Sequence, residues 1–161
     1  MRKKIVPILL ILLIFVSSFA YAEELMQMYV LCNPNDYVNA RYSASTKSSV
    51  EGRLECGDII ETDGEVKKDK QGRMWVHIVN PSFESDSWVC NMYLQDTEVV
   101  VRQCTGYVVG NGKTALRRSP KGKRIKWVTF GTELTILAMS DEWALTTQGY
   151  IMRDYLEVFY D

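Results

Sequence analysis

The single histidine and a group of acids are the residues best suited to acid–base chemistry in this sequence. His77 lies in the alternating stretch Val76-His77-Ile78, which predicts a strand that points the imidazole away from its apolar neighbours. A Cys–His or Ser–His nucleophile needs such a histidine beside a partner and an orienting group. Paired carboxylates could hydrolyse glycosides, but turn chemistry already explains Asp58, Asp63 and Glu65. We expect no catalytic residue, and a small cell-wall hydrolase is the least favoured alternative.

Four cysteines could bind a metal or form disulfides: Cys32, Cys56, Cys90 and Cys104. The sequence has no C-x-x-C pair and the histidine is not near a cysteine pair, so we expect no metal and no cofactor. An even number of cysteines favours disulfides in an exported chain. We favour Cys32–Cys56, which leaves Cys90–Cys104. Four buried thiols are the alternative.

The first 22 residues have the pattern of a signal peptide. A basic cluster, Arg2-Lys3-Lys4, precedes an apolar run over residues 5–16, and small residues end in Ala20-Tyr21-Ala22. This order is typical of a cleaved export signal, and the run is shorter than the ~20 residues of a membrane span. We expect cleavage after Ala22, with an uncleaved anchor as the alternative. The mature chain would be secreted or cell-wall associated, and it would meet the membrane only during export.

Charge is distributed unequally along the chain. Residues 23–98 hold 14 acids and 7 bases, whereas residues 99–161 hold 6 acids and 9 bases, so an acidic half precedes a basic one. The bases gather in residues 113–126, which contain no acid: Lys113, Arg117, Arg118, Lys121, Lys123, Arg124 and Lys126. Such a patch attracts anions, for example teichoic acid phosphates or lipid headgroups. The alternatives are a solvated loop or contact with the acidic half. Nucleic acid is not expected, because the exported chain is acidic overall.

Five landmarks recur in the same order in the two halves and indicate an internal duplication. In the first half they are V-N-A-R (38–41), the turn E-C-G-D, Trp75, Trp88-Val89 and Tyr93-Leu94; in the second half they are T-A-L-R (114–117), the turn T-F-G-T, Trp143, Tyr150-Ile151 and Tyr155-Leu156. The segments are short, rich in β-branched and aromatic residues, and bounded by turn residues. We predict an all-β fold with two small domains, residues 23–98 and 99–161, after an N-terminal signal-peptide helix over residues 1–22.

The repeated motifs resemble the bacterial SH3 (SH3b) family. That family shows an L/V-N-V-R strand, a K-x-G-T turn, a central Trp and a closing G-W-V-x-x-x-Y-L. The first copy has V-N-A-R, E-C-G-D, a Trp strand and S-W-V-C-N-M-Y-L; the second has A-L-R-R-S-P, F-G-T-E, E-W-A-L and G-Y-I-M-R-D-Y-L. The copies span residues 26–98 and 104–158. The resemblance implies two tandem SH3-like barrels, and it leaves no sequence for the Cys-peptidase domain that often accompanies such modules.

The resemblance also implies a non-enzymatic binding function. SH3b modules commonly bind peptidoglycan stem or bridge peptides, or target other proteins to the wall. The ligand would lie in a shallow groove between the long first loop and the Trp-bearing strand. We expect Trp75, Trp127 and Trp143 to form contact surface for sugar or peptide. The charge would come from Arg117, Arg118, Lys121, Lys123 and Arg124. The alternative is an extracellular adaptor that binds a protein partner through the acidic first domain.

Overall fold

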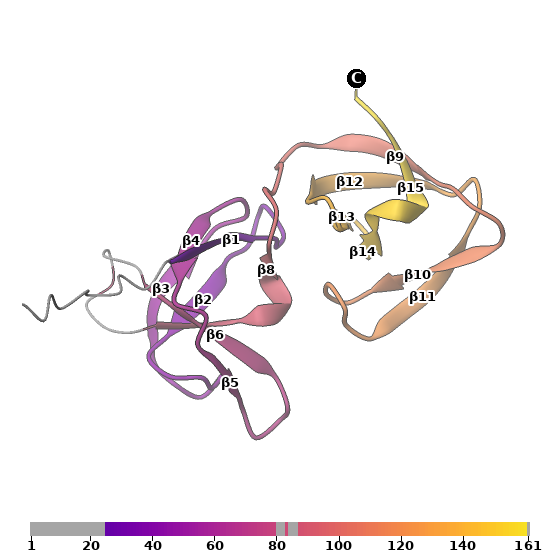
Figure 1. The fold of residues 1–161 in the computed structure, drawn as a ribbon. Coiled ribbons are helices and arrows are strands. Elements are labelled where there is room, and N and C mark those ends of the chain that lie inside the picture. Colours follow the sequence, from indigo (N-terminus) through magenta and orange to yellow (C-terminus); the bar gives the residue numbers. More distant parts are fainter. Residues whose placement is uncertain (1–24, 80–82, 84–86, 161) are drawn as a thin grey trace, which may run out of the picture.

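The computed structural model describes residues 25–79, 83 and 87–160 (Figure 1). These residues form β-strands and two short 3-10 turns, with no α-helix among them, so the predicted all-β class is confirmed. No helix in this part of the chain is long and apolar enough to cross a membrane. The predicted signal peptide and its cleavage after Ala22 lie outside the described residues.

We call the part of the chain with strands β1 to β8 the first module. Its strands are β1 (Met26–Val30), β2 (Val38–Arg41), β3 (Val50–Leu54), β4 (Ile59–Thr62), β5 (Val66–Lys68), β6 (Met74–Ile78), β7 (Ser87–Cys90) and β8 (Leu94–Gln95), with the 3-10 turn η1 (Asn91–Tyr93) before β8. They form a three-stranded sheet in the order β4-β1-β8 and a five-stranded sheet in the order β3-β2-β7-β6-β5. Alternating residues of β2 point inward, so Val38 and Ala40 join Ile60, Ile78 and Val89 in one core.

We call the part with strands β9 to β15 the second module. Its strands are β9 (Cys104–Val108), β10 (Lys113–Arg117), β11 (Arg124–Thr129), β12 (Glu133–Met139), β13 (Trp143–Thr146), β14 (Gly149–Met152) and β15 (Leu156–Phe159), with the 3-10 turn η2 (Arg153–Tyr155) before β15. They form one seven-stranded sheet in the order β11-β10-β14-β13-β12-β9-β15. The sheet buries its own core, which includes Leu116, Leu134, Ile136 and Ile151.

The strand pairings of the two modules correspond to each other. β2 lies between β3 and β7 as β10 lies between β11 and β14, and β1 lies between β4 and β8 as β9 lies between β12 and β15. β6 pairs with β7 as β13 pairs with β14, which places Trp75 opposite Cys90 and Trp143 opposite Met152. Positions in one module can therefore be matched with positions in the other by their pairing partners.

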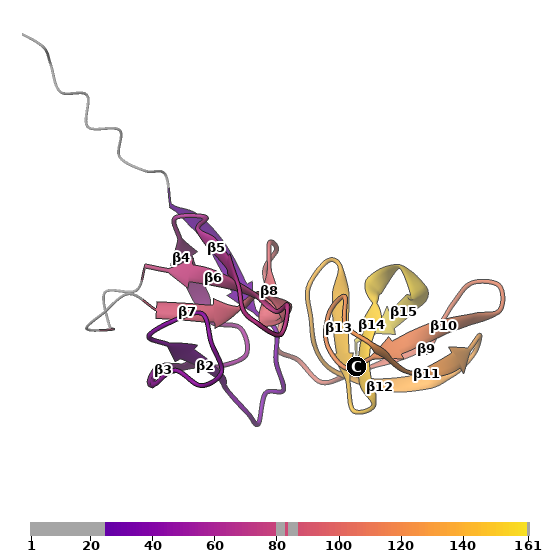
Figure 2. The same ribbon diagram turned by 90° about the horizontal axis from the view of Figure 1, so that it is seen from below.

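The two modules lie side by side (Figures 1 and 2). Apolar side chains of both modules pack in one cluster. Leu31 of the first module packs with Trp143, Leu145 and Tyr150 of the second. The Tyr150 hydroxyl donates to the Leu31 carbonyl oxygen at 3.4 Å. We call this contact the module seam. It fixes which face of the second module is covered.

Candidate ligand-binding cavities

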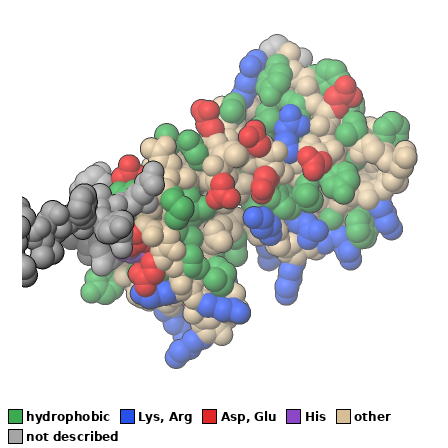
Figure 3. Space-filling view, viewed as in Figure 1, with side chains coloured by type: hydrophobic (Ala, Val, Ile, Leu, Met, Phe, Trp, Pro, Cys, Tyr) green, Lys and Arg blue, Asp and Glu red, His purple; other side chains and the backbone are tan. Residues whose placement is uncertain are grey.

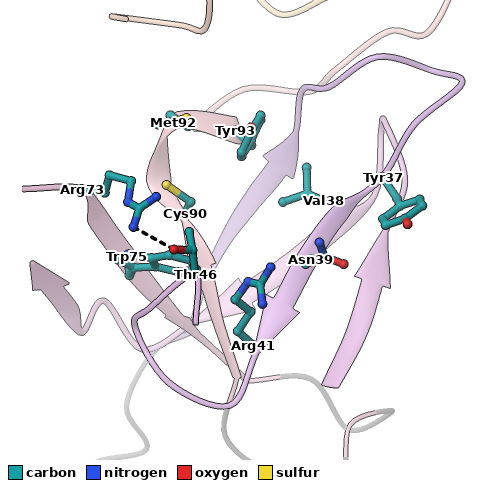
Figure 4. A pocket seen from close by; sticks show the side chains of 10 residues that line it. All are labelled: Tyr37, Val38, Asn39, Arg41, Thr46, Arg73, Trp75, Cys90, Met92 and Tyr93. Atoms are coloured by element: carbon teal, nitrogen blue, oxygen red, sulfur yellow. Dashed lines mark hydrogen bonds between the residues drawn. The ribbon is translucent and has the colours of Figure 1, made fainter. Parts of the chain in front are cut away.

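A cavity of about 210 Å³ opens on the first module between the loop after β2 and strand β6 (Figure 4). Its lining comes from β2, the loop after it, β6, β7, η1 and the residues just before β2 and β6. These residues are Tyr37, Val38, Asn39, Arg41, Thr46, Arg73, Trp75, Cys90, Met92 and Tyr93. We call it the Trp75 cavity. The first module thus has a cavity between its long first loop and its Trp-bearing strand. None of the seven clustered bases of the second module lines this cavity.

Hydrogen bonds hold the loop that forms one wall of the Trp75 cavity. Arg41 donates from Nη1 to the Ser48 carbonyl oxygen at 2.7 Å. Arg73 donates from Nη2 to Thr46 Oγ1 at 3.0 Å, the bond drawn in Figure 4. The first bond ties the loop to β2, and the second ties it to the residue before β6. The wall is therefore formed before a ligand arrives, as is usual for binding sites.

Asp69 fixes the opposite wall. Its Oδ2 accepts hydrogen bonds from Arg73 Nε at 2.7 Å and from Trp75 Nε1 at 3.1 Å. Burial alone would raise the pKa of Asp69, but the bonds from the Arg73 backbone, the Trp75 indole and the Arg73 guanidinium lower this pKa to about 2. The carboxylate is therefore ionised at neutral pH and holds a guanidinium beside the cavity.

A larger cleft of about 880 Å³ adjoins the Trp75 cavity. Arg73, Cys90 and Met92 line both spaces. Most of the apolar lining comes from the first module: Met26, Met28, Val66, Met74, Val76, Met92 and Leu94. The second module contributes residues 119–122 and Glu142. We call it the intermodule cleft. Methionine side chains are flexible and polarizable, so this surface can adapt to irregular apolar groups.

The three tryptophans predicted to form contact surface have different positions. Trp75 is only 2% exposed, under the loop after β2, and Trp143 is 4% exposed in the module seam. The expectation that these two rings lie open to a ligand is therefore wrong for this conformation, although Trp75 does contribute to the cavity wall. Trp127 is 47% exposed, with Lys113 and Arg124 over its ring at 4.9 and 4.4 Å from the centroid.

The predicted basic residues belong to β10, β11 and the turn between them. Figure 3 shows Lys and Arg side chains along the edge of the second module where Figure 1 places these strands. Arg118, Lys123 and Arg124 are exposed, whereas Arg117 is half-buried and donates to the Gly122 carbonyl oxygen at 2.9 Å. Lys121 lines the intermodule cleft and pairs with Glu142 at 3.8 Å. The structure does not bring these bases together with Trp75 or Trp143 in one site.

The four cysteines are thiols in the structure. Cys32 and Cys56 are hydrogen-bonding partners: this bond lowers the pKa of Cys56 to about 7 and raises the pKa of Cys32. The pairing we favoured therefore joins two side chains that touch. Cys90 packs with Trp75 and Trp88, whereas Cys104 lies in the core of the second module. The structure thus does not bring the remaining predicted pair together.

Sequence reasoning missed most of the polar cavity lining. Asn39 and Arg41 belong to the V-N-A-R motif, so that motif contained a signal for them. Arg73 and Thr46 come from a hairpin and a loop without any motif, and only strand pairing brings them to the same opening. The cleft methionines on β1 are two residues apart, a spacing that puts Met26 and Met28 on one face.

The fold and the cavities define an all-β protein with a candidate ligand-binding region on its first module. No family model and no curated protein sequence matches the chain. Two solved structures from Trichomonas vaginalis, of NlpC1 and NlpC2, are similar to it with 17% sequence identity and a TM-score of 0.33 each. The similarity covers 85% and 86% of this chain but 46% and 49% of those chains, so this chain spans about half their length. At that TM-score the likeness says nothing about activity.

Proposed function

We propose that this protein is a non-enzymatic binding protein of the bacterial cell envelope, with two SH3b-like modules, and that it takes a short peptidoglycan peptide in the Trp75 cavity. The observation that carries the proposal is the composition of the cavity wall. Arg41, Asn39 and Arg73 lie around an opening beside Trp75. Guanidinium groups bind carboxylates with charge-assisted hydrogen bonds, and the free carboxyl groups of stem peptides offer that partner.

The intermodule cleft extends this proposal to a longer ligand. It begins at Arg73 and Met92, where the Trp75 cavity ends, and it continues along apolar side chains of the first module. An extended peptide could place a carboxylate beside the arginines and its aliphatic groups along the methionines. A mostly apolar lining with a few convergent polar groups is typical of ligand sites.

Retention on purified sacculi tests the proposal. The protein without residues 1–22 should stay bound after anionic polymers are stripped from the wall. Arg41→Gln should weaken retention roughly 10- to 150-fold, because a lost charged hydrogen bond is worth ~1.5–3 kcal/mol. Lys70→Gln removes the same charge from an exposed position outside both cavities and should leave retention unchanged. Since Arg41 also ties the loop, Asn39→Ala provides a second variant, and thermal melting checks the fold of each.

Equal retention of Arg41→Gln, Asn39→Ala and Lys70→Gln would contradict binding in the Trp75 cavity. Retention that disappears when anionic polymers are removed would contradict peptidoglycan as the ligand. Release of soluble wall fragments by the protein would instead support the hydrolase alternative.

A second candidate ligand is an anionic wall polymer on the β10–β11 hairpin. It is favoured by the exposed bases and by Trp127, whose ring has Lys113 and Arg124 within 5 Å of its centroid. Replacing Arg117, Arg118, Lys121, Lys123 and Arg124 by Ser would abolish this binding. It would also be lost at ~0.5 M salt, where exposed charges are screened within a few ångströms. We expect most wall retention to survive both treatments, since none of the five bases lines the Trp75 cavity and Lys121 alone among them lines the intermodule cleft.

A further inference from the structure

Asp63, Glu65 and His77 meet at one point of the first module. His77 Nδ1 lies 2.7 Å from Asp63 Oδ2, and one ligand atom from each of the three side chains lies within 4.8 Å of the others. The Glu65 N–H donates to Asp63 Oδ1 at 2.9 Å, and the His77 N–H donates to the Glu65 carbonyl oxygen at 2.9 Å. Backbone and side-chain bonds therefore hold the three residues in register.

An extra residue in the first module creates this arrangement. Two residues separate Thr62 from Glu65, whereas one separates Ile136 from Ala138 at the matching place in β12. Because of the longer segment, β4 and β5 are two separate strands, whereas β12 is continuous. The segment contains Gly64, whose φ is +82°. That conformation is easily adopted by glycine and by few other residues. Irregularities of this kind re-aim side chains and are common at functional sites.

The second module shows that the fold itself does not need the polar trio. By strand pairing, Glu65 matches Ala138 and His77 matches Leu145. Both matching residues are buried in the module seam. Apolar residues thus complete the same strands in one module, while the other places a carboxylate and an imidazole there.

The imidazole of His77 is held on its other side by aromatic packing. Its ring lies 5.1 Å from the Trp88 ring, centroid to centroid, at an interplanar angle of 37°. The His77 side chain is 12% exposed and that of Asp63 is 23% exposed, so water reaches the pair without surrounding it. Glu65 pairs with Lys67 at 3.0 Å at the open side. The histidine ring is therefore held from two directions.

We propose that Asp63, Glu65 and His77 bind a divalent transition-metal ion such as Zn²⁺ or Mn²⁺. One imidazole nitrogen and two carboxylate oxygens suit ions of this class. The two atoms that now share a proton are close enough for both to contact one metal ion at ~2.0–2.2 Å. On binding, the neutral imidazole coordinates the ion through Nδ1 and carries its proton on Nε2. The two carboxylates balance the ion's two positive charges, and the remaining coordination positions take water.

The proposed site differs from the zinc motifs considered in the sequence. Those motifs place cysteine and histidine ligands at short, fixed spacings, and none is present. Here the histidine is 14 residues from Asp63 and reaches it through the pairing of β5 with β6. The site does not depend on the proposed peptide function.

The single histidine makes a direct test possible. Untagged, chelator-treated protein without residues 1–22 is titrated with ZnCl₂ while ring nitrogen and proton resonances are followed by NMR. Every imidazole signal belongs to His77, because the chain has no other histidine. We expect a saturable shift of Nδ1 with one ion per chain. Asp63→Asn and Glu65→Gln should each weaken binding at least ~10-fold, a loss that even outer-sphere substitutions at metal sites produce.

Matched controls separate the site from other effects. Glu61→Gln removes an exposed acid of β4 outside the trio and should keep full affinity. Cys32→Ser combined with Cys56→Ser removes the thiol pair, which could bind Zn²⁺ itself, and should leave the His77 shift unchanged. Asp63→Asn should fold, because the amide keeps an oxygen that accepts from the Glu65 N–H. His77→Leu should also fold, because leucine occupies the matching position, Leu145, in the second module.

Two results would overturn the proposal. The first is a His77 ring that shows no saturable shift with millimolar Zn²⁺ or Mn²⁺. The second is a shift that Asp63→Asn and Glu65→Gln leave at full affinity. Either result would mean that the trio is an ion pair and a turn without a metal.

Discussion

The strand pairings of the two modules correspond, but the matching faces have different neighbours. In the first module, Trp75 and Trp88 lie under the loop after β2, beside the Trp75 cavity. In the second module, Trp143 and Tyr150 occupy the matching positions and pack against Leu31 in the module seam. The first module thus keeps an opening on this face, whereas the second module packs the matching face against the first.

The difference leaves a cavity on one module and a covered face on the other. Polar residues remain around the face that stays open, including Asn39, Arg41 and Asp69. Tyr150 instead donates its hydroxyl hydrogen bond to the first module, and burial raises the pKa of that hydroxyl. The basic hairpin of the second module, β10 and β11, lies at one end of the strand order of its sheet.

The largest effect on stability should come from a substitution in the module seam. Trp143→Ala removes a ring that is 4% exposed in the module seam and should lower the free energy of unfolding by about 3–5 kcal/mol. Trp127→Ala removes the same side chain from a site that is 47% exposed and should cost under ~1 kcal/mol. Urea denaturation followed by fluorescence measures both. Similar losses for the two variants would mean that Trp143 is not buried in solution.

The stability of the first module should fall in acid because of Asp69. Burial would raise the pKa of Asp69, but four hydrogen bonds from Arg73, Trp75 and Gln71 outweigh it and lower the folded pKa from 3.8 to about 2. Its stabilising effect is therefore complete above the unfolded value and is lost as the pH falls from about 4 to about 2. The thermal melting temperature should drop over that range, and Asp69→Asn should remove this part of the dependence. A wild-type profile that the variant reproduces would contradict the role of Asp69.

The turn before Trp143 gives a comparison for this acid effect. There the backbone N–H of Trp143 donates to the Ser140 hydroxyl at 3.1 Å. A serine hydroxyl does not titrate in this pH range. Ser140→Ala should therefore lower stability by a similar amount at pH 5 and at pH 2.5. A loss that changes strongly between these two pH values would argue against placing the acid response in the first module.

The cysteine pair should show a smaller, kinetic effect. The hydrogen bond from Cys32 lowers the pKa of Cys56 to about 7, while burial raises the pKa of Cys90. In the reduced protein, iodoacetamide should therefore modify Cys56 before Cys90, with a midpoint near pH 7, because the thiolate is the reactive form. Mass spectrometry of peptides assigns the modified sites. A Cys56 midpoint near pH 9 would mean that Cys32 does not stabilise its thiolate.

The smallest effect should come from the surface of the first module. Lys67 pairs with Glu65 at 3.0 Å and lies 4.1 Å from the Trp88 ring centroid, but its side chain is 54% exposed. Lys67→Gln should cost less than ~1 kcal/mol, and high salt should reduce the difference further. Thermal unfolding in low and high salt checks this value. A larger, salt-independent loss would show that Lys67 packs more tightly than the ion pair requires.

The sequence could predict the all-β class and the strands, because those depend on local patterns. Turn residues and short β-branched runs mark β6 and β13, and the repeated spacing pairs Trp75 with Trp143. It could not predict the burial of these rings. Trp75 is covered by a loop and Trp143 by another module, and both contacts depend on tertiary packing.

The candidate sites were harder to predict for the same reason. Asp63-Gly64-Glu65 is typical of a turn, and the structure does place a strand break there. Their proximity to His77 follows from strand pairing across 14 residues, which no spacing motif records. The exposed bases were easier to find, since a run of charge without acids needs no tertiary information to remain at the surface.

The most direct test of the account is an NMR titration of the protein with a soluble peptidoglycan stem peptide, following backbone amides in both modules. We predict saturable shifts at Asn39, Arg41, Thr46 and Arg73, with the matching strands of the second module unchanged. Shifts confined to residues 113–127, or no saturable shift in the first module, would contradict a binding site beside Trp75.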